Sequence, residues 1–74
     1  MGKDQRDTQR EKVLTFLRDE GSITPLDALR EFGIMRLAAR IWELRKLGFS
    51  IEKNMESSRG RYGDEVRYAR YKLV

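Results

Sequence analysis

Two stretches of the chain carry the side chains best suited to chemistry, and the chemistry they suit is the recognition of nucleic acid. Residues 34–46 hold several cationic residues at helical spacing, and Arg59 and Arg61 flank a glycine in a turn-rich segment. A guanidinium group can bond both major-groove acceptors of guanine, and it also binds phosphate oxygens. The two stretches therefore predict contacts with the bases and the backbone of DNA.

The remaining side chains argue against catalysis. The chain has no histidine and no cysteine, so it lacks the commonest general base, a thiolate nucleophile and the usual zinc ligands. Carboxylates such as Asp27 and Glu31 are present, but their spacing of four residues is typical of a solvated helix face. The glycines do not follow the pattern of a phosphate-binding loop. We expect no enzymatic activity, no metal and no cofactor.

The length and charge of the chain indicate one small basic domain. It has 74 residues and a net charge of +4, and residues 34–74 sum to +5 whereas residues 1–33 sum to −1. A localised basic excess indicates a nucleic-acid surface better than the total charge does. No apolar run approaches the ~18 residues of a membrane span, and the first residues lack the apolar segment of a signal peptide. We expect a cytoplasmic protein without a membrane segment.

A first helix is predicted near the N-terminus. Thr8 and Glu11 have the spacing of a capping box, which places the helix start at Thr8 after a flexible tail over residues 1–7. Gly21 is placed to end this helix, because a left-handed backbone costs glycine little. Residues 22–23 then leave room only for a strand fragment.

Two further helices follow in quick succession. Thr24 is a good N-cap and Pro25 suits the first helical position, so a second helix begins here and ends at Gly33. A third helix is predicted over 34–47, with Gly48 as its terminator. Two short helices joined by a tight glycine turn form a helix-turn-helix.

The rest of the chain predicts a β-hairpin. Apolar and polar residues alternate over 49–55 and again over 69–73, and the polar, glycine-containing segment 57–64 between them reads as a long flexible tip. Three helices followed by a two-stranded hairpin give an α+β fold, the winged helix-turn-helix. The predicted domain covers residues 8–74.

The outer face of the third helix is the first candidate DNA surface. A recognition helix contacts base edges mainly through its N-terminal residues. Arg36 is the candidate base contact, and the small Ala39 would allow a close approach to a thymine methyl group. The full set of candidate DNA-binding residues in this helix is Met35, Arg36, Ala39, Arg40, Glu43 and Lys46.

For three residues of this helix, the sequence leaves two roles open. Arg40 lies at the edge of the apolar stripe, where it either contacts phosphate or forms a structural ion pair with Glu43, Glu31 or Asp27. Trp42 lies off the apolar stripe, and it either packs under a neighbouring element or belongs to a partner surface. Arg45 flanks the stripe on the other side, and we expect packing or an ion pair there more than contact with DNA.

The hairpin tip is the second candidate surface. Arginines next to glycine suit phosphates or a narrow minor groove. The candidate wing residues are Arg59, Gly60, Arg61 and Tyr62. Strand alternation places Tyr68, Arg70 and Lys72 on the face opposite Ala69, and these three, with Thr24 at the second helix, are further candidate phosphate contacts.

The sequence also resembles a known family, the small winged helix-turn-helix proteins of bacteriophages and prophages. The matching segments are SITPLDAL at 22–29, FGI at 32–34, RLAARIWELR at 36–45, GF at 48–49, Ile51 and RYARY at 67–71. The resemblance covers roughly residues 10–73. It implies the winged-helix fold and a DNA-binding or regulatory role, and it says nothing about the target.

These observations lead to one expected function and two alternatives. We expect a regulatory protein that binds double-stranded DNA, with the third helix in the major groove and the wing on the backbone or in the minor groove. Glu43 and Trp42 favour the first alternative, a protein–protein module that acts as an inhibitor or adaptor. The second alternative is an architectural or excision-type protein that bends DNA as a dimer or multimer.

Overall fold

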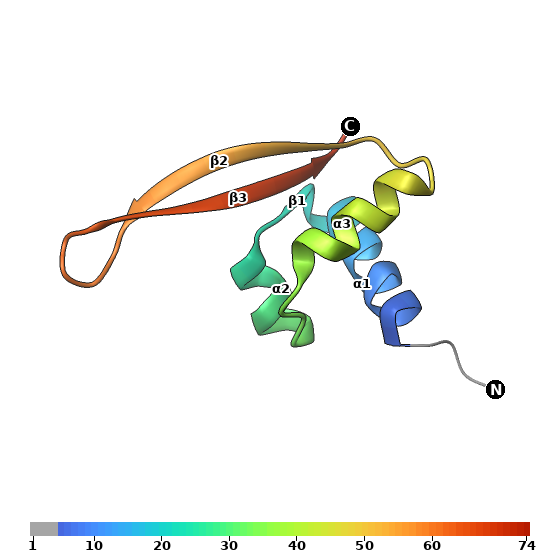
Figure 1. The fold of residues 1–74 in the computed structure, drawn as a ribbon, viewed down its shortest axis with the longest axis horizontal. Helices are drawn as coiled ribbons and strands as arrows, with labels where there is room; N and C mark the ends of the chain where they lie inside the picture. The colour runs from blue at the N-terminus through green and yellow to red at the C-terminus, as the bar shows by residue number, and fades with distance from the viewer. Residues whose placement is uncertain (1–4) are drawn as a thin grey trace.

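The computed structural model describes residues 5–74, and it contains three helices and a small antiparallel sheet (Figure 1). The elements in chain order are α1 (Gln5–Glu20), β1 (Ser22–Ile23), α2 (Pro25–Phe32), α3 (Leu37–Lys46), β2 (Ile51–Arg59) and β3 (Glu65–Leu73). The strands are arranged in the order β1-β3-β2. We call β2, β3 and the turn between them the wing. The expected α+β winged helix-turn-helix is confirmed.

Helix α1 begins earlier than the sequence suggested. It starts at Gln5, so the expectation of a start at Thr8 is wrong, and residues 5–7 belong to the helix. Nothing in these residues breaks a helix, and Asp7 pairs one turn later with Arg10, which favours the longer helix. The rest of the expected tail, residues 1–4, lies outside the described residues. Gly21 ends the helix at φ 89°, as expected.

Helix α2 has the predicted caps. Thr24 accepts a hydrogen bond from the Asp27 amide at 3.1 Å, and Asp27 accepts one from the Thr24 amide at 3.0 Å. Gly33 closes the other end in the left-handed conformation, with φ 66°. The amide of Ile34 then donates to the carbonyl of Ala28 at 3.1 Å, which turns the chain back toward α2.

Helix α3 is shorter than the predicted segment 34–47. It begins at Leu37, because Ile34 is buried in the core next to the α2 cap and Arg36 takes the N-cap position with φ −118°. The Arg36 carbonyl accepts the amides of Ala39 and Arg40. Arg36 therefore precedes the helix instead of lying within its first turn.

The wing is longer and its turn tighter than predicted. Strands β2 and β3 pair over nine residues each, from Ile51 opposite Leu73 to Arg59 opposite Glu65. The expected flexible tip over 57–64 is wrong, because only Gly60–Asp64 lie outside the strands. The strand fragment expected at residues 22–23 is β1. Its pairing was not predicted: Ser22 lies opposite Lys72 and Ile23 opposite Tyr71, which adds β1 to the other edge of β3.

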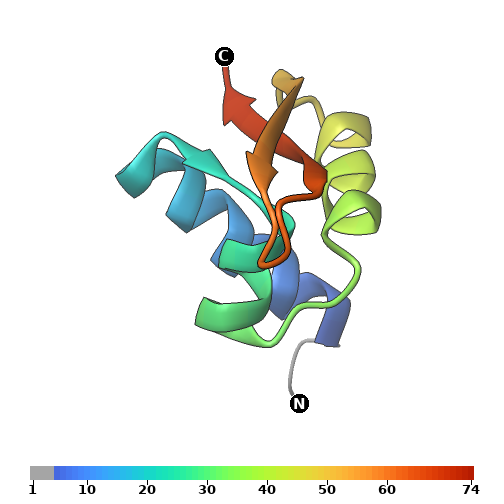
Figure 2. The ribbon, with the colours of Figure 1, turned by 90° about the vertical axis from the view of Figure 1, so that its left-hand side faces the viewer.

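The core lies where the three helices meet the base of the sheet. The fully buried side chains come from every layer, and they include Val13 and Leu17 of α1, Ile41 of α3, and Ile23 of β1. Tyr71 of β3 is 5% exposed and completes this cluster. Seen from its tip, the wing has α3 on one side and β1 with the C-terminal end of α1 on the other (Figure 2). Among the described helices, none has the length and apolar character needed to cross a bilayer.

Candidate nucleic-acid interface

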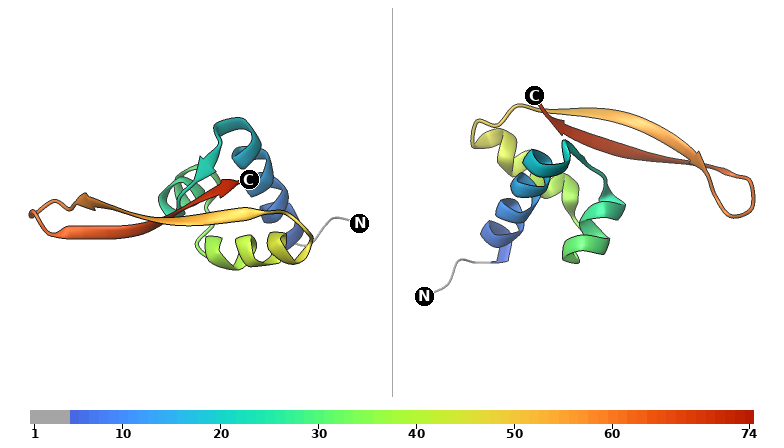
Figure 3. Two further views of the ribbon diagram at one scale, coloured as in Figure 1. Left: turned by 90° about the horizontal axis from the view of Figure 1, so that it is seen from above. Right: turned by 180° about the vertical axis from the view of Figure 1, so that it is seen from behind.

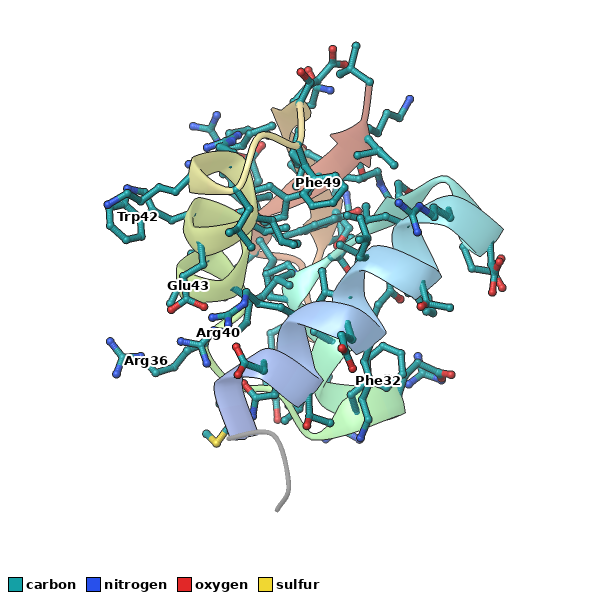
Figure 4. The ribbon with its side chains drawn as sticks, turned by 90° about the vertical axis from the view of Figure 1, so that its right-hand side faces the viewer. Phe32, Arg36, Arg40, Trp42, Glu43 and Phe49 are labelled. Atoms are coloured by element: carbon teal, nitrogen blue, oxygen red, sulfur yellow. The ribbon has the colours of Figure 1, made fainter. Side chains whose placement is uncertain are left out.

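The outer surface of α3 combines cations with apolar side chains. Arg36 and Lys46 are exposed near its two ends, and Ala38 and Trp42 are exposed between them. Trp42 is 58% exposed, and it projects from the same side of α3 as Arg36 (Figure 4). Among the residues that the structure describes, the Arg36 side chain has no hydrogen bond or ion pair. Its guanidinium group is therefore available for a ligand.

Arg40 and Glu43 point away from that surface, toward α1. Glu43 lies 2.7 Å from a terminal nitrogen of Arg10 and 3.2 Å from one of Arg40. The Arg40 Nε lies 3.1 Å from Glu43 in an orientation that gives an ion pair without a hydrogen bond. Arg40 also donates to Gln9 at 3.2 Å. We call Gln9, Arg10, Arg40 and Glu43 the α1–α3 polar cluster.

This cluster changes the expected roles of two candidates. Arg40 is 8% exposed, and of its three expected carboxylate partners the structure places Glu43 against it. The Glu43 carboxylate is shared between two guanidinium groups, so it does not present a negative charge to a phosphate. Sequence reasoning missed Arg10, because its partner lies 33 positions away and no local spacing marks such a contact.

Trp42, Met35 and Arg45 are the other large side chains in and around α3, and each has a distinct environment. Trp42 does not pack under a neighbouring element; it lies with the Lys46 ammonium 4.4 Å from its ring centroid. Met35 precedes the helix and is 84% exposed. Arg45 donates to the Ile51 carbonyl at 3.0 and 2.8 Å, which fastens the start of β2 to the end of α3. Arg45 thus has the structural role that we favoured, through a carbonyl and not through a carboxylate.

The wing tip brings its candidate residues together at the far end of the molecule. Both views in Figure 3 show β2 and β3 extending beyond the helices. Arg59 is the last residue of β2, whereas Arg61 and Tyr62 lie in the turn, and all three are exposed. Hydrogen bonds from Gly60 to Asp64 at 2.7 Å and from Gly63 to Gly60 at 3.1 Å hold the turn in shape. The two arginines thus lie at the far end of the wing, Arg59 at the end of β2 and Arg61 in the hydrogen-bonded turn.

Three of the four candidate phosphate contacts surround a hollow between α2 and the wing. The hollow has a volume of about 570 Å³, and Thr24, Tyr68 and Arg70 line it together with the apolar Leu26 and Val66. Thr24 caps α2, and the Arg70 guanidinium is already paired. Tyr68 and Arg70 are only partly exposed, so the face that carries them is not fully open to a duplex. Lys72 is exposed and lies outside the hollow.

Arg70 holds the three strands together. Its Nε lies 2.9 Å from both carboxylate oxygens of Glu56 on β2, and a terminal nitrogen donates to Ser22 on β1 at 2.9 Å. The hydrogen bond from Arg70 lowers the pKa of Glu56 below its ordinary 4.5, with a smaller contribution from Tyr68. The same contact raises the pKa of Arg70. These contacts give Arg70 a role inside the sheet.

The Glu56–Arg70 pair predicts a pH-dependent contribution to stability. Because the pKa of Glu56 is lowered in the folded state, the pair stabilises the fold above the ordinary pKa of 4.5 and loses its effect as the pH falls through the lowered value. Glu56→Gln should therefore lower the urea midpoint at pH 7 and have little effect near pH 2. Glu52→Gln, on the same strand but hydrogen-bonded to Asn54, is the control. An equal loss from Glu56→Gln at both pH values would contradict the prediction.

Comparison with known families identifies the class of this domain. A family model described as a winged helix-turn-helix domain matches residues 8–74, and the chain belongs to this family. Neither the curated proteins nor the solved structures gave a match. Within the described part of the chain, no group of three or more acidic residues is placed to hold a metal ion. Winged helix-turn-helix domains are associated with DNA binding.

Proposed function

We propose that this protein is a small regulatory protein of phage type that binds double-stranded DNA in the bacterial cytoplasm. In this proposal, α3 enters the major groove with Arg36 on a base edge. Ala39 and Lys46 lie along the same surface. Arg59 and Arg61 of the wing contact the backbone or the adjacent minor groove, with Gly60 and Tyr62 shaping the turn. Lys72 is a further candidate phosphate contact.

The observation that supports this proposal most strongly is the position of Glu43. A carboxylate on a recognition helix would repel phosphate, but Arg10 and Arg40 hold this one at 2.7 and 3.2 Å. The exposed cations on the outer surface of α3 are then not opposed by an unpaired carboxylate on the same helix. Because the wing carries Arg59 and Arg61 at its far end, it offers a second basic element to the same duplex.

A titration of a fluorescent random duplex tests the proposal directly. Fluorescence anisotropy at 50 and 200 mM salt should show binding that weakens steeply with salt, because cations on phosphates release counterions. Mass measurement of the same samples would give the oligomeric state with and without DNA. A protein that leaves the anisotropy unchanged at 50 mM salt would overturn the proposal.

The wing arginines should contribute affinity without sequence preference. Replacing Arg59 and Arg61 together with alanine should weaken binding to every duplex and lower the steepness of the log–log salt dependence by about 1.8, the value for two phosphates. The matched control removes Lys12 and Arg18, two exposed cations of α1, and should leave the slope unchanged. If both pairs change the slope equally, the wing has no special part in DNA binding.

One observation favours a second function, a protein–protein module. Trp42 and Met35 are large apolar side chains that are 58% and 84% exposed, and tryptophan is frequent at the energetic centres of protein interfaces. A complex centred on such residues would change little between 50 and 200 mM salt. The same salt series therefore separates the two functions.

A further inference from the structure

Trp42 is the largest side chain on the outer surface of α3, and the DNA proposal above leaves it without a role. Its indole ring is 58% exposed, although tryptophan is on average a highly buried residue. Lys46, one turn later, places its ammonium 4.4 Å from the ring centroid. This contact covers one face of the ring with the lysine side chain and leaves a positive charge beside it.

The surface around Trp42 has few groups that can hydrogen-bond to bases. Glu43 is engaged by Arg10 and Arg40, and the neighbouring Ala38 and Ala39 have only methyl groups. Among the described residues of this surface, the fork of Arg36 is the group suited to bidentate base recognition. The rest of the surface is apolar and positively charged.

We propose that Trp42 contacts thymine methyl groups in the major groove, and that it is a specificity-determining residue of α3. This inference rests on the proposed DNA-binding function. The thymine C5-methyl is the apolar feature that the major groove offers, and apolar side chains recognise it. Lys46 places a cation beside the ring that can meet a phosphate at the edge of the groove, and Arg36 adds a second positive charge to the surface, which favours DNA over a protein partner for this face.

The distance between Arg36 and Trp42 along α3 limits the spacing of the bases that they can contact. Arg36 and Trp42 are six residues apart, which is about 9 Å along a helix. Stacked base pairs are about 3.4 Å apart, so this distance spans at most about three base pairs along the duplex axis. Duplexes selected from a random pool should therefore contain a guanine and a thymine within about this separation.

Replacement of thymine by uracil in the selected duplex tests the role of Trp42. Uracil lacks the methyl group but keeps the hydrogen-bonding groups, and each methyl buried by the indole should be worth about fourfold in affinity. The wild-type protein should prefer the thymine duplex, and Trp42→Ala should bind both duplexes equally. Trp42 is the single tryptophan of the chain, so its fluorescence should also change in the DNA complex.

Leu26→Ala is the matched control, because Leu26 is also 58% exposed but lies beside the hollow under the wing. This variant should keep the preference for thymine. Equal wild-type affinity for both duplexes, or an indole emission that DNA does not alter, would overturn the inference and leave the proposed function intact. Failure to bind either duplex at low salt would overturn both.

Discussion

Replacing Glu43 with alanine should lower the free energy of unfolding by about 2–3 kcal/mol. The substitution leaves Arg40, which is 8% exposed, without its carboxylate partner, and it also removes the link from Arg10. Removal of one partner from a fully buried pair costs about 3–5 kcal/mol, and Glu43 falls below this range because its side chain is 23% exposed. The total stability of a domain of this size is only about 4–11 kcal/mol, so the loss should be plain in urea denaturation at pH 7.

Two companion variants separate a structural role of Glu43 from a role in DNA binding. Glu43→Gln keeps an oxygen that accepts from Arg10 and Arg40, so its loss should be smaller. The double variant Arg40→Met, Glu43→Leu replaces the ion pair with apolar groups and should recover most of the stability. If Glu43→Ala left the urea midpoint unchanged and altered only the preferred base, Glu43 would be a base contact and the polar cluster would have no structural role.

Replacing Arg36 with alanine should weaken binding to the preferred duplex by about 1–3 kcal/mol, which is about fivefold to 150-fold. Arg36 is exposed at the N-cap of α3 and has no partner among the described residues, so its loss removes a base contact without disturbing the core. Base choice should relax at one position, as a competition assay with single-base variants of the duplex would show.

Arg36→Lys distinguishes base recognition from simple charge. Lysine keeps the positive charge but lacks the planar fork that bonds two acceptors of guanine. Its affinity for random duplex should stay near that of the wild type while the preference for guanine falls. A variant with alanine at this position and unchanged base preference would show that α3 does not dock through its N-terminal end.

The fold was predictable where local chemistry determines it. Thr24, Pro25 and Asp27 specify the start of α2, and Gly33 specifies its end, because each acts through hydrogen bonds or backbone angles within one turn. The predicted start of α1 was wrong, although it also rested on a local signal. The capping-box spacing at Thr8 is a local signal, but nothing before it stops the helix, and the helix continues back to Gln5.

The candidate site was harder to predict, because its geometry depends on contacts between distant segments. The sequence placed Arg40 near the edge of the apolar stripe but did not distinguish Glu43 from Glu31 and Asp27 as its ion-pair partner. Arg10, which completes the cluster, lies 33 positions before Glu43. The length of the wing strands was underestimated. Only Ile51 of β2 is buried, so the alternation of buried and exposed residues that predicts a strand is missing from the rest of β2. Pairing with β3, and not alternating burial, holds the rest of that strand.

The pairing of β1 with β3 determines when the domain can fold during its synthesis. Ile23 pairs with Tyr71, so the core joins segments separated by most of the chain. A nascent chain that contains all three helices still lacks the Tyr71 ring and leaves the apolar side chains around Ile23 exposed. Contacts between distant segments form late, because the loop between them must close first. We therefore expect this domain to fold only after β3 has left the ribosome.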